Sequence, residues 1–188
     1  MAIQHAYLAG PEVFLPNAAE IGRAKKRLCE QYGVAGVFPL DTVLKGQGRE
    51  LGLAISAANE QLMRGSHFII ANMTPFRGPS TDVGTAYEMG FARALGLPVF
   101  AYTNDPTRFE QRTQQFLSRL GELDPDGTDA HHMSIEAFEL SDNLMLAGAL
   151  TEQDYEPTHG QAELVHRFVD LHAFERCLAR AANHLQVK

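Results

Sequence analysis

The sequence is short of several features that would point to particular classes of protein. It has 16 Lys and Arg against 23 Asp and Glu, a formal net charge of −7, and no cluster of basic residues. Nucleic-acid binding depends largely on neutralising phosphates, so this composition argues against a nucleic-acid partner and favours a small neutral ligand. No apolar run approaches the roughly 20 residues that span a bilayer. We therefore expect no membrane partner either.

Cysteine is equally scarce. The two cysteines, Cys29 and Cys177, have no CxxC spacing, and the first five residues lack the charged and apolar regions of a signal peptide. This predicts a reduced, cytoplasmic protein. The eight histidines lack the i, i+4 spacing of a helical metal pair, and no Gly-Lys-Ser/Thr follows Gly46 and Gly48. We therefore expect no metal site and no phosphate-binding loop of that type.

What is present suits one well-buried domain over residues 1–188. The chain is 45% hydrophobic and 21% charged, and it shows no internal repeat or low-complexity tract. Short apolar runs alternate with helical periodicity, which is typical of an α/β fold with a parallel sheet flanked by helices. The expected strands are residues 3–9, 34–38, 67–72 and 98–102.

Helices are expected between these strands and at the end of the chain. The first follows Asn17, the second covers about 50–64, and the third runs from near Asp82 to Gly96, a C-cap glycine followed by Pro98. Residues 103–159 have little pattern. Five apolar positions then predict a long C-terminal amphipathic helix: Leu164, Phe168, Leu171, Leu178 and Leu185.

Four chain segments are expected to meet at one edge of this sheet. In open α/β sheets, ligands bind outside the carboxyl ends of the strands, near a reversal of strand order. The segments that follow the four strands there are 10–14, 38–41, 72–82 and 102–105. A site built from these loops is therefore the default prediction.

Glu88 is the strongest single candidate in that region. It stands in the second turn of the third helix, and Gly84 lies one turn before it on the same face. The glycine leaves open space beneath the carboxylate, in which a compact ring such as a sugar would fit. A lone carboxylate on a small, apolar face is costly unless it has a task, and we interpret Glu88 as a nucleophile.

Two further side chains could assist Glu88, although each has a plain structural explanation. Asp82 lies in the first helical turn, where the helix dipole alone favours a negative charge. Tyr7 lies near the end of the first strand and could orient the carboxylate, yet strand tyrosines are commonly core residues. A carboxylate nucleophile suits attack on an anomeric carbon, because a nearby anion stabilises the oxocarbenium-like transition state.

Several segments together resemble the nucleoside 2-deoxyribosyltransferase family. The fairly specific core is D-x-G-T-x-x-E-x-G at 82–90, with Tyr-Leu-Ala-Gly-Pro upstream. The resemblance extends over residues 3 to about 145 and rests on five segments: 7–11, 38–41, 71–80, 82–90 and the Ser-Asp-Asn of 141–143. It implies a flavodoxin-like doubly wound fold and retaining transfer of 2-deoxyribose between nucleobases, without a cofactor.

The resemblance also assigns roles to individual residues. It implies that Glu88 is the nucleophile, that Tyr7 positions it, and that Asp82 helps to hold and activate the nucleoside. Phe14 would pack against the base or sugar, and Gly10, in the same loop, is also expected to bind the substrate. The Ser-Asp-Asn segment implies that Asn143 reaches into the site of a neighbouring subunit and contacts the 5′-hydroxyl of the sugar bound there. Met145 would line the same pocket. The active unit would then be a homo-oligomer with shared sites.

One departure from the family concerns the base. Several relatives have an aspartate on the second helix, whereas this chain has Asn59, which can both donate and accept a hydrogen bond. Together with the 74–80 loop, this resembles the purine-preferring branch. A plain helix-surface role for Asn59 is the alternative.

Two other functions fit the same residues. A hydrolase of 2-deoxynucleosides or their 5-phosphates would use water in place of the acceptor base, and the phosphates would require several donors, of which Arg77 is one candidate. Ser80-Thr81-Asp82-Val83 lacks the Pro-Gly-Gly of the phosphoribohydrolases that release cytokinin bases. A non-catalytic nucleoside-binding domain is the third possibility.

Overall fold

The computed structural model describes residues 3–151 and 155–186. Its five strands are all parallel and follow the order β2-β1-β3-β4-β5. This order confirms the expected flavodoxin-like, doubly wound fold. The short fifth strand lies in the region where the sequence has little pattern. The strand bounds are β1 Gln4–Ala9, β2 Val34–Val37, β3 Phe68–Asn72, β4 Val99–Thr103 and β5 Thr158–His159.

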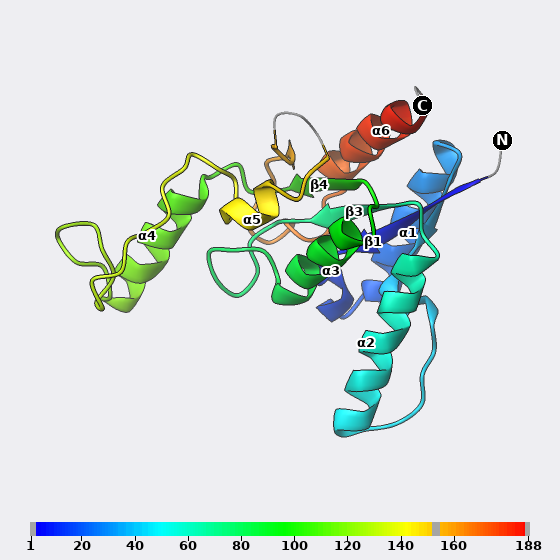
Figure 1. Ribbon diagram of the computed structural model, residues 1–188, viewed down its shortest axis with the longest axis horizontal. Coiled ribbons are helices and arrows are strands. Elements are labelled where there is room, and N and C mark those ends of the chain that lie inside the picture. Colours follow the sequence, from blue (N-terminus) through cyan, green and yellow to red (C-terminus); the bar gives the residue numbers. More distant parts are fainter. Residues whose placement is uncertain (1–2, 152–154, 187–188) are drawn as a thin grey trace.

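Helices cover both faces of the sheet (Figure 1). The α-helices are α1 Ala18–Gln31, α2 Gly48–Arg64, α3 Val83–Ala94, α4 Phe109–Leu120, α5 Leu144–Ala147 and α6 His172–Gln186. Two 3-10 turns, η1 Pro11–Phe14 and η2 Pro39–Asp41, follow β1 and β2. No helix in the described ranges combines the length and apolarity needed to cross a membrane.

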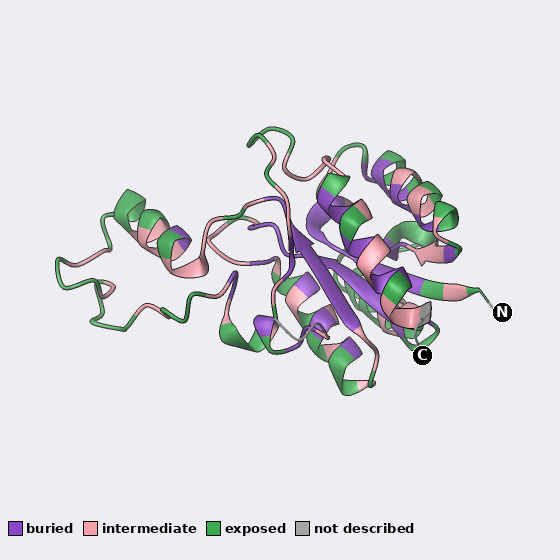
Figure 2. Cartoon of the chain, turned by 90° about the horizontal axis from the view of Figure 1, so that it is seen from above, coloured by how far each residue is buried: buried purple, intermediate pink, exposed green. Residues whose placement is uncertain are grey.

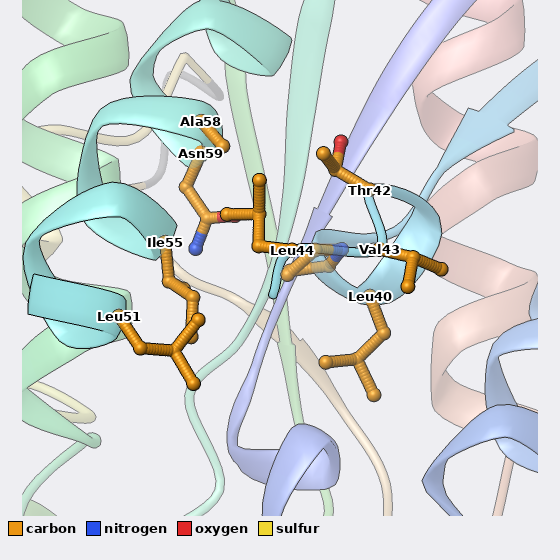
Figure 3. A pocket seen from close by; sticks show the side chains of 9 residues that line it. Leu40, Thr42, Val43, Leu44, Leu51, Ile55, Ala58 and Asn59 are labelled. Carbon is orange, nitrogen blue, oxygen red and sulfur yellow. The ribbon is translucent and has the colours of Figure 1, made fainter. Parts of the chain in front are cut away.

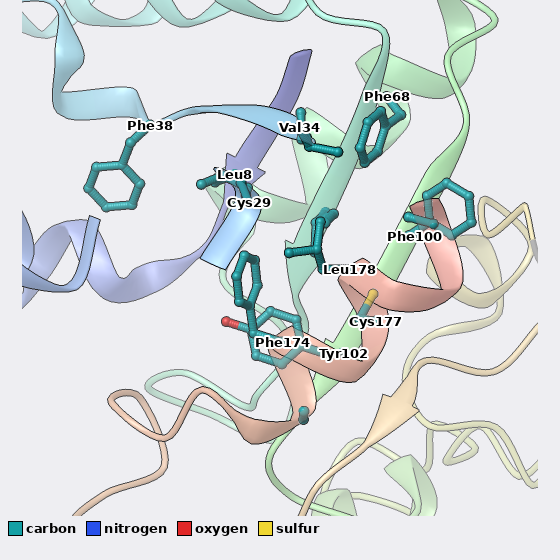
Figure 4. Packing of buried hydrophobic residues seen from close by; sticks show 14 residues of the cluster. Leu8, Cys29, Val34, Phe38, Phe68, Phe100, Tyr102, Phe174, Cys177 and Leu178 are labelled. Carbon is teal, nitrogen blue, oxygen red and sulfur yellow. The ribbon is translucent and has the colours of Figure 1, made fainter. Parts of the chain in front are cut away.

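Alternation along β1 divides its side chains between the two faces. Ala6 and Leu8 join a buried cluster with α1 and α6, where Phe174 and Leu178 also pack (Figure 4). Tyr7 and Ala9 join the opposite cluster, which includes Met89 of α3 and Met63 of α2. Because successive strand residues point to opposite faces, Tyr7 is directed toward α3. This placement prepares the site.

Two helices extend away from the sheet. Figure 1 shows α2 and α4 projecting on separate sides, and Figure 2 shows α4 and the loop after it coloured mainly as exposed or intermediate. Met63 is the one fully buried residue of α2, and Arg112 is that of α4. Helices in compact domains bury an apolar stripe, so both have faces that this chain leaves uncovered.

The C-terminal helix begins later than the sequence pattern predicts. It starts at His172, so Leu164 and Phe168 precede it, and Leu164 is exposed. The Asn104 side-chain amide donates hydrogen bonds to the carbonyl oxygens of Arg167 and Asp170, at 2.9 and 3.0 Å. A continuous helix would use those carbonyls for its own ladder. A tertiary contact from β4's exit therefore replaces the first turns of the expected helix.

Candidate active site

Glu88 and Tyr7 meet between α3 and β1. The Tyr7 hydroxyl donates a hydrogen bond to Glu88 Oε1 at 2.5 Å, and Tyr7 is fully buried while Glu88 is partly buried. The contact follows from the alternation in β1, since Tyr7 is on the α3 face. The sequence-based pairing of these two residues is thus seen directly in the geometry.

The surroundings of Glu88 keep its proton affinity high. Burial raises the pKa of its carboxyl from 4.5 to about 7; the hydrogen bond from Tyr7 opposes this rise, and the charge of Asp82 adds to it. Burial, with the adjacent Glu88, also raises the pKa of Tyr7 far above its usual 10. Tyr7 therefore stays a hydrogen-bond donor at neutral pH. Glu88 becomes an anion near neutrality.

Asp82 is the N-cap residue of α3, whereas the sequence pattern predicted a position within the first helical turn. Its Oδ2 accepts hydrogen bonds from the Thr85 backbone N–H at 3.1 Å and from the Thr85 hydroxyl at 3.3 Å. Asp82 therefore has a structural role, but as a cap that satisfies a free N–H at the helix start and not as a first-turn residue. Its other oxygen, Oδ1, makes no hydrogen bond within the described residues, so the cap leaves one acceptor available.

Asp82 and Glu88 line one cavity of about 290 Å³ at the carboxyl ends of the strands, and the buried Tyr7 reaches it only through its hydrogen bond to Glu88. A Cβ added to Gly84 would meet only Asp82 Oδ2, at 3.0 Å, so the expected open space above this glycine exists. Two carboxylates and no basic residue lie in the lining, which consists of Gly10, Val13, Phe14, Pro39, Leu40, Ile55, Asn59, Asp82, Gly84, Thr85 and Glu88.

Phe14 belongs to an aromatic stack at the cavity's edge. Its ring lies parallel to that of Phe76, with centroids 5.3 Å apart, and the Arg77 guanidinium lies over both rings. Arg77 itself lines a separate cavity of about 310 Å³ with Arg112, Arg119 and Arg167. The basic side chains thus gather outside the Glu88 cavity.

Asn143 and Met145 do not reach this cavity within one chain. Asn143 caps α5, accepting from the Met145 N–H at 3.0 Å and donating to Glu136 at 2.6 Å. Met145 is mostly exposed. The preceding Asp142 instead accepts hydrogen bonds from Ser80 and Thr81, at 2.5 and 2.8 Å, and so attaches this segment to the loop before α3.

A buried network beneath the cavity was missed from the sequence. Glu12 of η1 is fully buried and forms an ion pair with the equally buried Lys25 of α1. Glu12 Oε1 also accepts from Asn72 at 2.9 Å and from Tyr102 at 2.8 Å. Lys25 interrupts the apolar spacing of Ile21 and Cys29, four residues to either side. That position in an otherwise apolar stripe was the signal available.

Gly10 is fixed by the same network. A Cβ at this position would lie 2.0 Å from Glu12 Oε2 and 2.9 Å from Asn72 Cβ. Any larger residue would displace the carboxylate that anchors η1. Gly10 therefore contributes to the cavity through close backbone approach.

Comparison with known proteins gives this geometry a context. A family model described as Nucleoside 2-deoxyribosyltransferase matches residues 6–145, well over half of the chain. The chain belongs to this family. The matched range holds Tyr7, Asp82, Glu88 and the Ser-Asp-Asn segment, while β5 and α6 lie beyond it.

Solved structures are similar to this member of the nucleoside 2-deoxyribosyltransferase family over nearly its whole length. The structure of a 2-desoxiribosyltransferase from Leishmania mexicana is 26% identical, with a TM-score of 0.65, covering 96% of this chain and 98% of that one. A conserved protein from Enterococcus faecalis V583, 17% identical, with a TM-score of 0.54 and coverage of 96% and 99%, shows the fold alone.

A relative by sequence is an uncharacterised protein of Schizosaccharomyces pombe. It is 35% identical over 115 residues, which are 58% of this chain and 54% of that protein. The chain therefore spans about half the length of this curated relative. Its description adds no activity to the nucleoside 2-deoxyribosyltransferase assignment.

Proposed function

We propose that this chain transfers 2-deoxyribose between nucleobases by a retaining double displacement through a deoxyribosyl–Glu88 ester. The observation that carries the proposal is the Tyr7–Glu88 hydrogen bond of 2.5 Å at the wall of a cavity that Gly84 keeps open. Family membership supports the same chemistry. The cavity accepts a sugar ring, and the carboxylate supplies a nucleophile.

The first displacement forms the covalent intermediate. The Glu88 carboxylate attacks C1′ of the nucleoside, the C1′–N bond breaks, and the base leaves with its electron pair as it takes up a proton from water. Tyr7 holds the attacking carboxylate by a hydrogen bond to Oε1, and Oε2, which accepts no hydrogen bond from the described part of the chain, can attack. The developing oxocarbenium charge faces two carboxylates and no cation within the lining.

The second displacement reverses these steps with another base. An incoming nucleobase attacks C1′ from the face that the first base left and gives up its ring N–H proton to water, the ester bond breaks, and Glu88 recovers its negative charge. Two inversions give net retention. Asp82 Oδ1, which is free of partners in the described residues, can accept a hydrogen bond from the nucleoside during both steps.

The lining favours nucleosides over their 5-phosphates. Phosphate recognition calls for cationic donors, whereas Arg77 and its arginine neighbours line a different cavity. Asn59 at the end of the Glu88 cavity supports a preference for purines, because an amide can donate and accept at the N6 and N7 edge of adenine. We propose purines as the preferred bases.

The active unit in this proposal is a homo-oligomer. Asn143 and the exposed Met145 lie outside the cavity of their own chain. Their position supports a role in the cavity of a neighbouring subunit, where Asn143 would meet the sugar 5′-hydroxyl.

Incubation with deoxyinosine and adenine tests the function. Deoxyadenosine and hypoxanthine should form together, and Glu88→Ala should abolish exchange while still binding deoxyinosine. Free deoxyribose without deoxyadenosine would identify a hydrolase instead, and tight binding without any product would identify a nucleoside-binding domain. Replacing adenine with thymine should slow exchange if purines are preferred.

A further inference from the structure

A second cavity opens beside the Glu88 cavity and has a different character. It measures about 240 Å³ and lies between α2 and the segment after β2 (Figure 3). Figure 3 shows Leu51 and Ile55 extending from the helix toward Leu40 and Leu44 on the opposite wall. The lining consists of Pro39, Leu40, Thr42, Val43, Leu44, Leu51, Ile55, Ala58 and Asn59. No charged residue is among them.

The two cavities adjoin each other. They share Pro39, Leu40, Ile55 and Asn59, whereas Glu88 and Asp82 line only the first. A ligand fixed at Glu88 and extending past Asn59 therefore enters the apolar cavity.

Asn59 marks the boundary with an unused polar group. Its Oδ1 is buried and has no hydrogen-bond partner in the described residues. A buried acceptor without a donor costs free energy, and a ligand with an N–H group at this point would remove that cost. Beyond Asn59, the walls offer only Thr42 as a polar side chain.

The apolar cavity is also open to solvent. Val43 is 87% exposed, Leu40 is 47% exposed and Ile55 is 42% exposed. A concave apolar surface beside a reaction site is a common feature of ligand-binding pockets. Contact with an apolar group would remove the surface of these side chains from water and so stabilise the complex.

The geometry of a purine matches this order of surfaces. Its N9 is bonded to C1′, which must lie at Glu88, and its 6-substituent lies at the opposite end of the ring system. An amino group at that end presents an N–H to Asn59. A group attached to the same nitrogen continues into the apolar cavity, while one N–H remains for the hydrogen bond.

We infer that this site takes purines bearing an apolar substituent on the 6-amino nitrogen and prefers them to unsubstituted adenine. The inference rests on the proposed deoxyribosyl transfer for the position of the sugar. It assigns recognition of the N–H to Asn59 and recognition of the substituent to the Leu40–Leu51–Ile55 wall.

Binding of N6-benzyladenine and adenine, measured by isothermal titration calorimetry, tests the inference without turnover. N6-benzyladenine should bind at least about tenfold more tightly, because burial of its ring removes apolar surface from water. Exchange with deoxyinosine as donor should show the same order in kcat/KM for the two acceptors. Equal or weaker binding of N6-benzyladenine would overturn the inference.

Matched variants on α2 locate the effect. Ala58 lines the apolar cavity but not the Glu88 cavity. Ala58→Phe should therefore abolish the preference for N6-benzyladenine and leave adenine binding unchanged. Ala57→Phe, on the exposed neighbouring residue, should change neither. Leu44→Asp provides a second variant: Leu44 is half-buried and lines the apolar cavity but not the Glu88 cavity, so the new charge should weaken binding of N6-benzyladenine and leave adenine binding unchanged.

The outcomes separate this inference from the transferase itself. Exchange with adenine but no preference for N6-benzyladenine would overturn the inference about substituted purines and leave the proposed transferase activity standing. Preferential binding without exchange sinks the transferase and leaves the cavity assignment standing. An Ala58→Phe protein with an altered oligomeric mass and an unchanged preference would show that the cavity is a subunit contact, against the inference.

Discussion

At the scale of single residues, the site depends on a carboxylate that is buried and so loses most of the water that would otherwise solvate it. Glu88 gains one strong hydrogen bond from Tyr7, yet burial outweighs that bond and leaves its pKa near 7. A nucleophile must be ionised to attack, and a poorly solvated anion is a more reactive one. Reactivity and folding stability therefore oppose each other at this residue.

Glu88→Gln should stabilise the protein at pH 8 and not at pH 4. The folded pKa of about 7 exceeds the ordinary 4.5, so the folded state keeps the proton longer than the unfolded state does. Stability contributed by this group is full below pH 4.5, falls between pH 4.5 and 7, and remains lost above. We expect a gain of about 1–3 kcal/mol at pH 8. Urea unfolding at both pH values measures it; an equal gain at both would contradict the assignment.

Tyr7→Phe should reduce kcat and shift the acidic limb of the pH–rate profile to higher pH. The hydrogen bond from Tyr7 lowers the pKa of Glu88, so its loss leaves less nucleophile ionised at neutral pH. A fall of about tenfold to a thousandfold in kcat is expected when one positioned donor is removed. The dependence of kcat/KM on pH provides the measurement. An unchanged acidic limb would show that Tyr7 is only a core residue.

At the scale of elements, η1 is held in place by the buried Glu12–Lys25 pair. Gly10→Ala should destabilise the fold by about 1–3 kcal/mol, because the new Cβ would overlap Glu12 Oε2. Gly90→Ala is the matched control: its Cβ would meet nothing within 4 Å in α3, and replacing a mid-helix glycine gains about 0.5–1 kcal/mol. Thermal unfolding compares the two. Similar effects of both changes would refute the role given to Gly10.

Elements with local signals could be predicted from the sequence. Four strands were evident because each is a short apolar run next to a glycine, a proline or a polar residue. Helix α3 was evident because Asp82 marks its start and Gly96 lies just after its end. The start of α6 was not, because it depends on Asn104 bonding to carbonyls more than 60 residues away. β5, two residues long, is defined by pairing with β4 and not by its own pattern.

At the scale of the whole molecule, part of the candidate site could be predicted and part could not. The Tyr7–Glu88 contact follows from strand alternation and the rule for carboxyl-end loops. The apolar cavity between α2 and the 40–44 segment does not, because it requires the angle at which α2 leaves the sheet. The Glu12 network requires side chains from η1, α1, β3 and β4 to come together in the fold.

The proposed homo-oligomer would have shared sites, and mixed variants test this. Glu88→Ala and Asn143→Ala proteins should each lose exchange. Unfolding and refolding the two together should restore it, to about a quarter of the wild-type level in a random mixture of dimers. Separate refolding serves as the control. No recovery in an assembled mixture would place Asn143 in its own chain's chemistry.

The most direct test of the account is a search for the covalent intermediate. A 2-deoxy-2-fluoroarabinosyl purine nucleoside slows both displacements by opposing positive charge at C1′, so the ester should accumulate. Peptide mass spectrometry after acid quench should find one fluorinated sugar on Glu88, which adenine then releases as a nucleoside. Sugar attached elsewhere, or base exchange by an enzyme that never becomes labelled, would contradict Glu88 as the nucleophile.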